Sequence, residues 1–147
     1  AIEEDLINPH KMVQIGQRTT GYSADDFEWV SQQGVRLVNA EECWYQSLTP
    51  LMAEVRETIG TETPVYLSFD IDGIDPAFAP GTGTPEPGGL TNTQAIEIIR
   101  GCWGLNLVGS DLVEVSPQYD TTGNTALLAA NLVFEMLCSF PGCLRRD

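Results

Sequence analysis

The sequence predicts an α/β fold in which helices pack on a parallel β-sheet. Short apolar runs rich in β-branched residues alternate with longer segments in which apolar residues recur at helical spacing. Parallel strands need long crossover connections, which are usually helical, so this regular alternation indicates consecutive βαβ units. No internal repeat, low-complexity tract or linker interrupts residues 1–147, which we therefore expect to form a single domain.

The first three elements are expected to be a strand, a helix and a second strand. Residues 12–16 form a short apolar run typical of a strand. Ser23 can cap a helix over residues 23–33, because its hydroxyl can accept a backbone N–H of the first turn. Gly34 is expected to end this helix, and the apolar residues 35–38 predict the second strand.

A helix and a strand follow in the middle of the chain. Thr49 and Pro50 predict the N-cap and first position of a helix over residues 49–58, since the N–H that proline lacks would have no helical partner there. Gly60 is expected to end this helix. The apolar run that begins at Val65 predicts a strand over residues 65–72.

The C-terminal third predicts a helix, a strand and a final helix. Thr91 can cap a helix over residues 91–103, whose apolar residues recur at helical spacing. Residues 105–115 predict a strand that contains Gly109. Residues 122–140 are apolar around most of a helix circumference, so we expect this last helix to be largely buried.

Composition narrows the classes of partner. The formal net charge of −14 argues against nucleic acid and anionic membranes, and it suits a cationic substrate. The apolar stretch 126–140 is too short to span a membrane. The four cysteines form no Cys-x-x-Cys pair, and we expect reduced, mostly buried thiols in an intracellular protein, cytoplasmic or mitochondrial if eukaryotic.

Two aspartates follow the apolar run Val65–Phe69, which is typical of a buried parallel strand. Residues i and i+2 of a strand point to the same face, so Asp70 and Asp72 are expected to direct their carboxylates together. Two such charges repel each other and resist desolvation, and a divalent cation is the simplest compensation. An aspartate pair at a strand end can also merely cap the next loop or helix.

The segment after these aspartates, residues 75–90, is rich in proline and glycine. Such a composition can form a shaped, relatively rigid loop, or it can mark a disordered linker. Because this segment joins an apolar strand to an amphipathic helix, we expect an ordered loop. A loop at the carboxyl end of a parallel strand is where α/β sheets place their ligand sites.

These residues resemble the signature of the ureohydrolases, the family of arginase, agmatinase and guanidinobutyrase. The matching segments are Ser68–Pro76, Ala79–Pro85, Gly88–Leu90, Asp111–Pro117 and Gly123–Ala126. The resemblance, closest to the agmatinase branch, implies a three-layer fold with helices on both faces of the parallel sheet. It also implies two manganese ions per active site in the complete enzyme and a metal-bridging hydroxide that attacks a guanidinium carbon to release urea.

The resemblance also implies residue roles. Asp70 would bridge both manganese ions, Asp72 would bind one of them, and Glu114 would hold the guanidinium group of the substrate. A carboxylate can bind a planar guanidinium through paired, charge-assisted hydrogen bonds. Glu114 follows an apolar run, as a strand-end site residue should, although an ordinary strand-end carboxylate would look the same.

The family's upstream His-x-Asp-Ala-His-x-Asp motif and its catalytic histidine are absent from this sequence. The one histidine, His10, lies in a polar stretch and is expected to be exposed. The chain also opens on Ala1 without an initiator methionine, so we expect the C-terminal portion of a longer enzyme. We expect the full-length form to be a homo-oligomer. The alternative from another class is a naturally truncated, non-catalytic homologue that acts through protein contacts.

One stretch bears on the substrate. Arginases carry aspartates where this chain has Thr19 and Gly21, so free arginine is disfavoured. We expect hydrolysis of agmatine to putrescine and urea. The alternative is a guanidinobutyrase or another hydrolase of non-arginine guanidino acids; a substrate carboxylate would then need a cationic partner, for which Arg18 is the nearest candidate.

Overall fold

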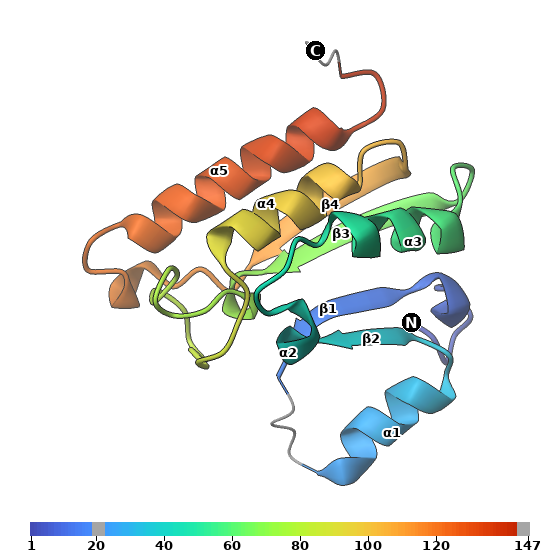
Figure 1. The fold of residues 1–147 in the computed structure, drawn as a ribbon, viewed down its shortest axis with the longest axis horizontal. Helices are drawn as coiled ribbons and strands as arrows, with labels where there is room; N and C mark the ends of the chain where they lie inside the picture. Colours follow the sequence, from blue (N-terminus) through green and yellow to red (C-terminus); the bar gives the residue numbers. More distant parts are fainter. Residues whose placement is uncertain (19–22, 144–147) are drawn as a thin grey trace.

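The computed structural model describes residues 1–18 and 23–143 and confirms an α/β fold of parallel strands and helices (Figure 1). Strand β1 (Val13–Gln17) pairs in parallel with β2 (Arg36–Asn39), and β3 (Pro64–Asp70) pairs in parallel with β4 (Asn106–Val113). Within the described residues these are two separate two-stranded sheets, not the one continuous sheet that the sequence predicts.

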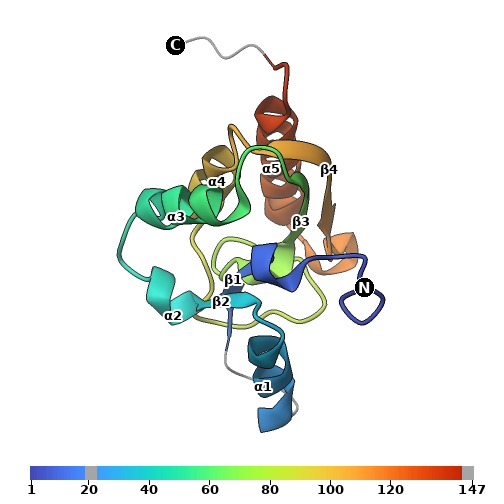
Figure 2. The ribbon, with the colours of Figure 1, turned by 90° about the vertical axis from the view of Figure 1, so that its right-hand side faces the viewer.

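Among the described residues, five α-helices connect and cover the strands. They are α1 (Ala24–Gln32), α2 (Ala40–Cys43), α3 (Thr49–Ile59), α4 (Asn92–Gly101) and α5 (Asn124–Ser139). Helices α3, α4 and α5 lie on one side of the strands and α1 lies on the other (Figures 1 and 2). The predicted helix starts are close to the observed ones, and Thr91 caps α4 by accepting the N–H of Gln94.

The short helix α2 is absent from the sequence prediction. Asn39, at the end of β2, precedes it, and the Glu42 side chain accepts the backbone N–H of Asn39 at 2.8 Å. Such a capping box satisfies backbone groups that would otherwise be left open at a helix start. One turn of helix is too short to give the apolar periodicity on which the prediction depends.

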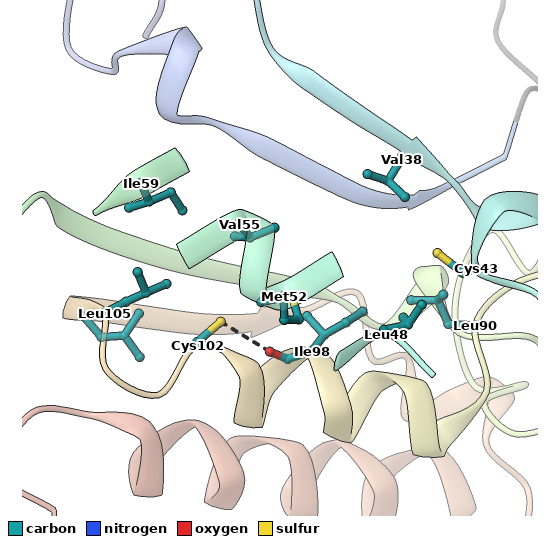
Figure 3. Close-up of a cluster of buried hydrophobic side chains, with 11 residues drawn as sticks. Val38, Cys43, Leu48, Met52, Val55, Ile59, Leu90, Ile98, Cys102 and Leu105 are labelled. Carbon is teal, nitrogen blue, oxygen red and sulfur yellow. Dashed lines mark hydrogen bonds between the residues drawn. The ribbon is translucent and has the colours of Figure 1, made fainter. Parts of the chain in front are cut away.

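The larger core cluster joins α3 and α4 to both strand pairs (Figure 3). Met52 and Val55 of α3 and Ile98 and Cys102 of α4 are buried in it. The thiol of Cys102 donates to the carbonyl of Ile98, and burial raises its pKa to about 11. A second cluster lies under α5 and includes Phe69 at the end of β3. These clusters fix the carboxyl end of β3, where the two aspartates follow.

Strand β3 is buried on one face only. Leu67 and Phe69 pack into the core, whereas Tyr66 is 62% exposed. On the exposed face Asp111 of β4 accepts hydrogen bonds from the hydroxyls of Tyr66 at 2.9 Å and Ser68 at 2.7 Å. The prediction of a buried strand therefore holds for one face only among the described residues.

The prediction that the last helix is largely buried is also wrong. Thr125, Ala129, Leu132 and Met136 of α5 face the core. On the outer side Leu127 is 72%, Phe134 61% and Leu137 58% exposed, so no element among the described residues covers them. None of the helices in residues 1–18 and 23–143 is long and apolar enough to cross a membrane.

All four cysteines are free thiols, as predicted, but only two of them are buried. Cys43 and Cys102 lie in the core, whereas Cys138 and Cys143 are exposed near the C-terminal end of α5.

Candidate active site

A turn, rather than a strand, brings Asp70 and Asp72 together. Strand β3 ends at Asp70, and the 3₁₀ turn η2 (Ile71–Gly73) follows. The carboxylate of Asp70 accepts the backbone N–H of Asp72 at 2.9 Å. The argument from strand alternation is therefore wrong, because the side chain of Asp70 takes the N–H that a continuing strand would use.

The charges of Asp72 and Glu114 both act on Asp70 at this turn. Loss of hydration raises the pKa of Asp70, the N–H of Asp72 opposes that rise, and the negative charges of Asp72 and Glu114 add to it. Glu114 directly follows β4, the neighbour of β3. The ends of these two parallel strands thus bring together the carboxylates that the sequence singles out.

Asp72 has one oxygen that fits a cation. The Thr84 hydroxyl donates to Oδ2, whereas Oδ1 is buried and has no hydrogen-bond partner. A buried carboxylate oxygen without a partner is costly, and a divalent cation would relieve that cost. Within the described residues, however, no three His, Cys, Asp or Glu side chains form a group that could hold a metal ion. Asp70 and Asp72 therefore fit part of a metal site, and their role as ligands stays a prediction.

Glu114 occupies a strained backbone conformation. Its φ is 66°, in the left-handed region, and its carbonyl accepts the Thr82 hydroxyl at 3.0 Å. A non-glycine residue held in this region costs about 1–3 kcal/mol, and such strain is concentrated at functional sites. Its carboxylate is exposed beside the aspartate turn, which suits a substrate contact. The predicted contact with a guanidinium group stays a prediction.

The proline- and glycine-rich segment 75–90 is an ordered loop, as predicted. The carboxylate of Asp75 accepts the N–H groups of Ala77 at 2.9 Å and Gly88 at 2.7 Å, and these bonds lower its pKa. The indole N–H of Trp44 donates to the Gly88 carbonyl at 2.9 Å. The loop is thus attached both to its own first residue and to the segment after α2.

Gly89 fits where a side chain cannot. A Cβ at this position would lie 2.6 Å from the backbone nitrogen of Asp75 and 2.9 Å from the carbonyl oxygen of Gly73. We expect Gly89→Ala to lower the free energy of unfolding by about 1–3 kcal/mol, because the backbone must move to make room. Gly83→Ala, which would meet nothing within 4 Å, is the matched control and should change it by less than about 0.5 kcal/mol. Urea unfolding of the two variants measures the difference, and equal midpoints would contradict the expectation.

Arg18 does not offer a free guanidinium to a substrate carboxylate. It donates through Nη1 to the carbonyl of Gly16 at 3.0 Å and through Nη2 to the carbonyl of Asp72. His10 is exposed in the 3₁₀ turn η1 (Pro9–Lys11), as predicted. Thr19 and Gly21, the positions that disfavour arginine, lie outside the described residues.

Sequence reasoning missed the two threonines of the loop. Thr84 contacts Asp72, and Thr82 contacts the backbone of Glu114, so one short segment touches both parts of the candidate site. The alternating Gly-Thr-Gly-Thr run at residues 81–84 is the signal that could have found them.

A family model and individual proteins that resemble this chain point to the same family. The family model described as "Arginase family" matches residues 1–138. The chain is 69% identical over 146 residues to a guanidinobutyrase of Pseudomonas aeruginosa. The match covers 99% of this chain and 46% of that protein. It is 61% identical over 141 residues to the mitochondrial agmatinase of Gallus gallus, covering 96% of this chain and 41% of that protein.

Solved structures agree with the sequence relatives. The proclavaminate amidino hydrolase from Streptomyces clavuligerus superposes with a TM-score of 0.88 at 43% identity, over 95% of this chain and 46% of that chain. The chain thus spans less than half the length of the relatives that it matches. With the family model matched over nearly all of its residues, the chain belongs to the arginase family.

Proposed function

We propose that this chain forms one part of a manganese-dependent ureohydrolase that hydrolyses the guanidino group of a small compound. The observation that carries the proposal is that Asp70 and Asp72, with an unpaired buried oxygen on Asp72, lie at the end of β3 beside the end of β4, which Glu114 follows. The two aspartates suit part of a metal site, and the glutamate carboxylate suits a guanidinium ion. Family membership supports the same reading.

Each carboxylate has a distinct role in this proposal. Asp70 and Asp72 hold manganese, and residues outside those described here supply the remaining ligands. When bound, the two ions would lower the pKa of a water molecule and so supply a nucleophile. Glu114 holds the guanidinium through paired hydrogen bonds and thereby places its carbon for attack. The loop holds this arrangement through Thr82 and Thr84.

The substrate that similarity favours is a guanidino acid, with 4-guanidinobutyrate ahead of agmatine. The relative with 69% identity is named guanidinobutyrase, whereas the agmatinase from Gallus gallus is 61% identical. This order supports the alternative stated above over agmatine itself. Because both relatives are more than twice as long as this chain, the preference must be measured in a complete catalytic domain.

Two chimeras test the function and the preference together. In each, this chain replaces the residues that it matches, either in the Pseudomonas aeruginosa guanidinobutyrase or in the Gallus gallus agmatinase. We expect both to release urea with Mn²⁺ and to prefer 4-guanidinobutyrate if this chain determines the choice. A preference that follows the host enzyme would place the choice in the other half, and no urea release from either would contradict the proposal.

The 147-residue chain alone is expected to bind Mn²⁺ weakly and to hydrolyse neither substrate. Two aspartates cannot fill two metal sites that each need about six ligands, and the described residues contain no further cluster of ligands. A urea assay with the chain and saturating Mn²⁺, with the guanidinobutyrase chimera as positive control, measures this. Measurable urea from the chain alone would contradict the ligand count.

A further inference from the structure

Arg18 links the ends of two strands that belong to different sheets. It follows β1, and its guanidinium reaches the carbonyl of Asp72 in η2, which follows β3. Its second nitrogen donates to the carbonyl of Gly16, at the end of its own strand. The guanidinium is part-buried, and its Nε has no hydrogen-bond partner. A partly buried cation that binds two backbone carbonyls holds their positions relative to each other.

We propose that Arg18 is a positioning residue of the candidate metal site: by binding the carbonyls of Gly16 and Asp72, it fixes η2 and thereby directs the carboxylate of Asp72. This proposal rests on the proposed function, because it assumes that the turn holds a metal ligand. It gives Arg18 a role other than the one its charge suggests, which is to bind the carboxylate of a guanidino acid.

The loop after the turn also holds it from outside, since the Gly73 carbonyl accepts the backbone N–H of Leu90 at 2.9 Å and the Thr84 hydroxyl donates to the Asp72 carboxylate. Within η2 and its flanks, the N–H of Asp72 bonds to the Asp70 side chain and the N–H of Ile74 bonds to the carbonyl of Ile71 at 3.1 Å. These bonds and the loop contacts join the turn to residues 70–90, whereas Arg18 joins it to the end of β1 by hydrogen bonds. A 3₁₀ segment of three residues has only one turn of hydrogen bonds, so an external contact has a large influence on its order.

Backbone geometry brings Arg18 within reach of the turn. Gly16 has a φ of 91°, and a Cβ there would lie 3.0 Å from the Leu90 side chain and 3.8 Å from the Gly73 carbonyl. The end of β1 therefore approaches η2 closely at a residue that only glycine occupies without strain. Arginine suits the link because its planar guanidinium presents several donors in a fixed fork, whereas lysine offers one flexible ammonium.

Three readings of Arg18 make different predictions. As a positioning residue, its loss should disorder η2 and weaken Mn²⁺ binding. As a charge alone, its loss should strengthen Mn²⁺ binding, because a nearby cation repels the metal. As a partner of the substrate carboxylate, its loss should raise KM for 4-guanidinobutyrate and leave both agmatine hydrolysis and Mn²⁺ binding unchanged.

Hydrogen exchange tests the turn without metal or substrate. In the 147-residue chain, Arg18→Met should speed amide exchange at Asp72 and Ile74 by about tenfold or more, because local opening of η2 becomes easier. Arg18→Lys should have a smaller effect in the same direction. Arg36→Met is the matched control, since the Arg36 side chain forms an exposed ion pair with Glu54, away from η2, and its loss should leave these amides unchanged. Unchanged exchange in both Arg18 variants would overturn the proposal.

Metal binding and kinetics complete the test in the guanidinobutyrase chimera. Arg18→Met should weaken Mn²⁺ binding by about 10- to 100-fold, the range seen when partners of metal ligands are lost, and should affect both substrates equally at limiting Mn²⁺. Equal or tighter Mn²⁺ binding, or a KM rise confined to 4-guanidinobutyrate, would overturn the proposal. If Arg18→Met does not fold, Arg18→Lys decides by the same criteria. A wild-type chimera that binds no Mn²⁺ would instead overturn the proposed function, so the two failures are distinguishable.

Discussion

Asp70→Asn is expected to abolish Mn²⁺ retention and to lower kcat/KM of the guanidinobutyrase chimera by more than about 100-fold, the upper loss seen for mere partners of metal ligands. The substitution removes the charge of the residue proposed to serve both ions, and it leaves one oxygen in place of two equivalent ones. The N–H of Asp72 already engages Oδ1, so an amide oxygen that keeps this bond turns its NH₂ group towards the metal. An NH₂ group cannot bind a cation.

Asp72→Asn is the comparison that distinguishes a residue that binds both metal ions from a residue that binds one. Asp72 is proposed to bind one ion, so its asparagine variant should lose chiefly one Mn²⁺ per site and keep more of the other. Glu57→Gln, an exposed carboxylate on α3, controls for the loss of one negative charge. Metal analysis and urea release on the same samples measure all three. Full Mn²⁺ occupancy and normal turnover in both aspartate variants would show that neither is a ligand.

The positions of the candidate residues were predictable because they are local in sequence, whereas their roles stay a prediction. Asp70 and Asp72 flank one residue, and the strand before them was recognisable from its apolar run. Glu114 was assigned from the family resemblance and its place after an apolar run, and the parallel pairing of β3 with β4 puts it at the same edge of the sheet as the aspartates. The N-cap at Thr91 was equally local, since a single side chain determines it.

The turn η2 was missed although the sequence contains its signal. Asp70 can accept the N–H of a residue two positions later, and Asp72-Gly73 is a common turn dipeptide. Strand propensity in the preceding run outweighed this signal. The error matters because the side-chain directions in a 3₁₀ turn differ from those in a strand, so Asp70 and Asp72 were paired for the wrong geometric reason.

Burial could not be predicted where it depends on what packs against an element. Helix α5 is apolar on nearly every side, yet its outer side chains, such as Phe134, are exposed in the described residues. The hydrophobic pattern indicates which helix faces are apolar. It does not indicate which element packs on them, since that element need not lie nearby in the sequence. The same reason explains the exposed face of β3 and the division of the strands into two pairs.

Glu114→Gln is expected to keep both metal ions in the guanidinobutyrase chimera while lowering kcat/KM by about tenfold to several hundredfold. Glutamine retains one acceptor oxygen but loses the charge and half of the paired geometry that binds a guanidinium. A hydrogen bond to a charged group contributes about 1.5–3 kcal/mol, which corresponds to this range of rates. Urea release and Mn²⁺ content measured on one sample separate substrate binding from metal binding. Loss of Mn²⁺ together with activity would reassign Glu114 to the metal ligands.

Glu114→Gly distinguishes a functional carboxylate from an ordinary strand-end residue by its opposite effects on stability and turnover. The φ of 66° is strained for glutamate and free for glycine. The free energy of unfolding of the glycine variant, measured by urea unfolding of the chain, should therefore be equal or higher by up to about 1 kcal/mol. The same substitution should lower turnover of the chimera at least as much as Glu114→Gln, because no acceptor remains. If glutamate is strained at this position and stability does not require it, a role in substrate binding would explain why the residue is glutamate. Unchanged kinetics in both variants would leave Glu114 as a strand-end carboxylate without a role in the reaction.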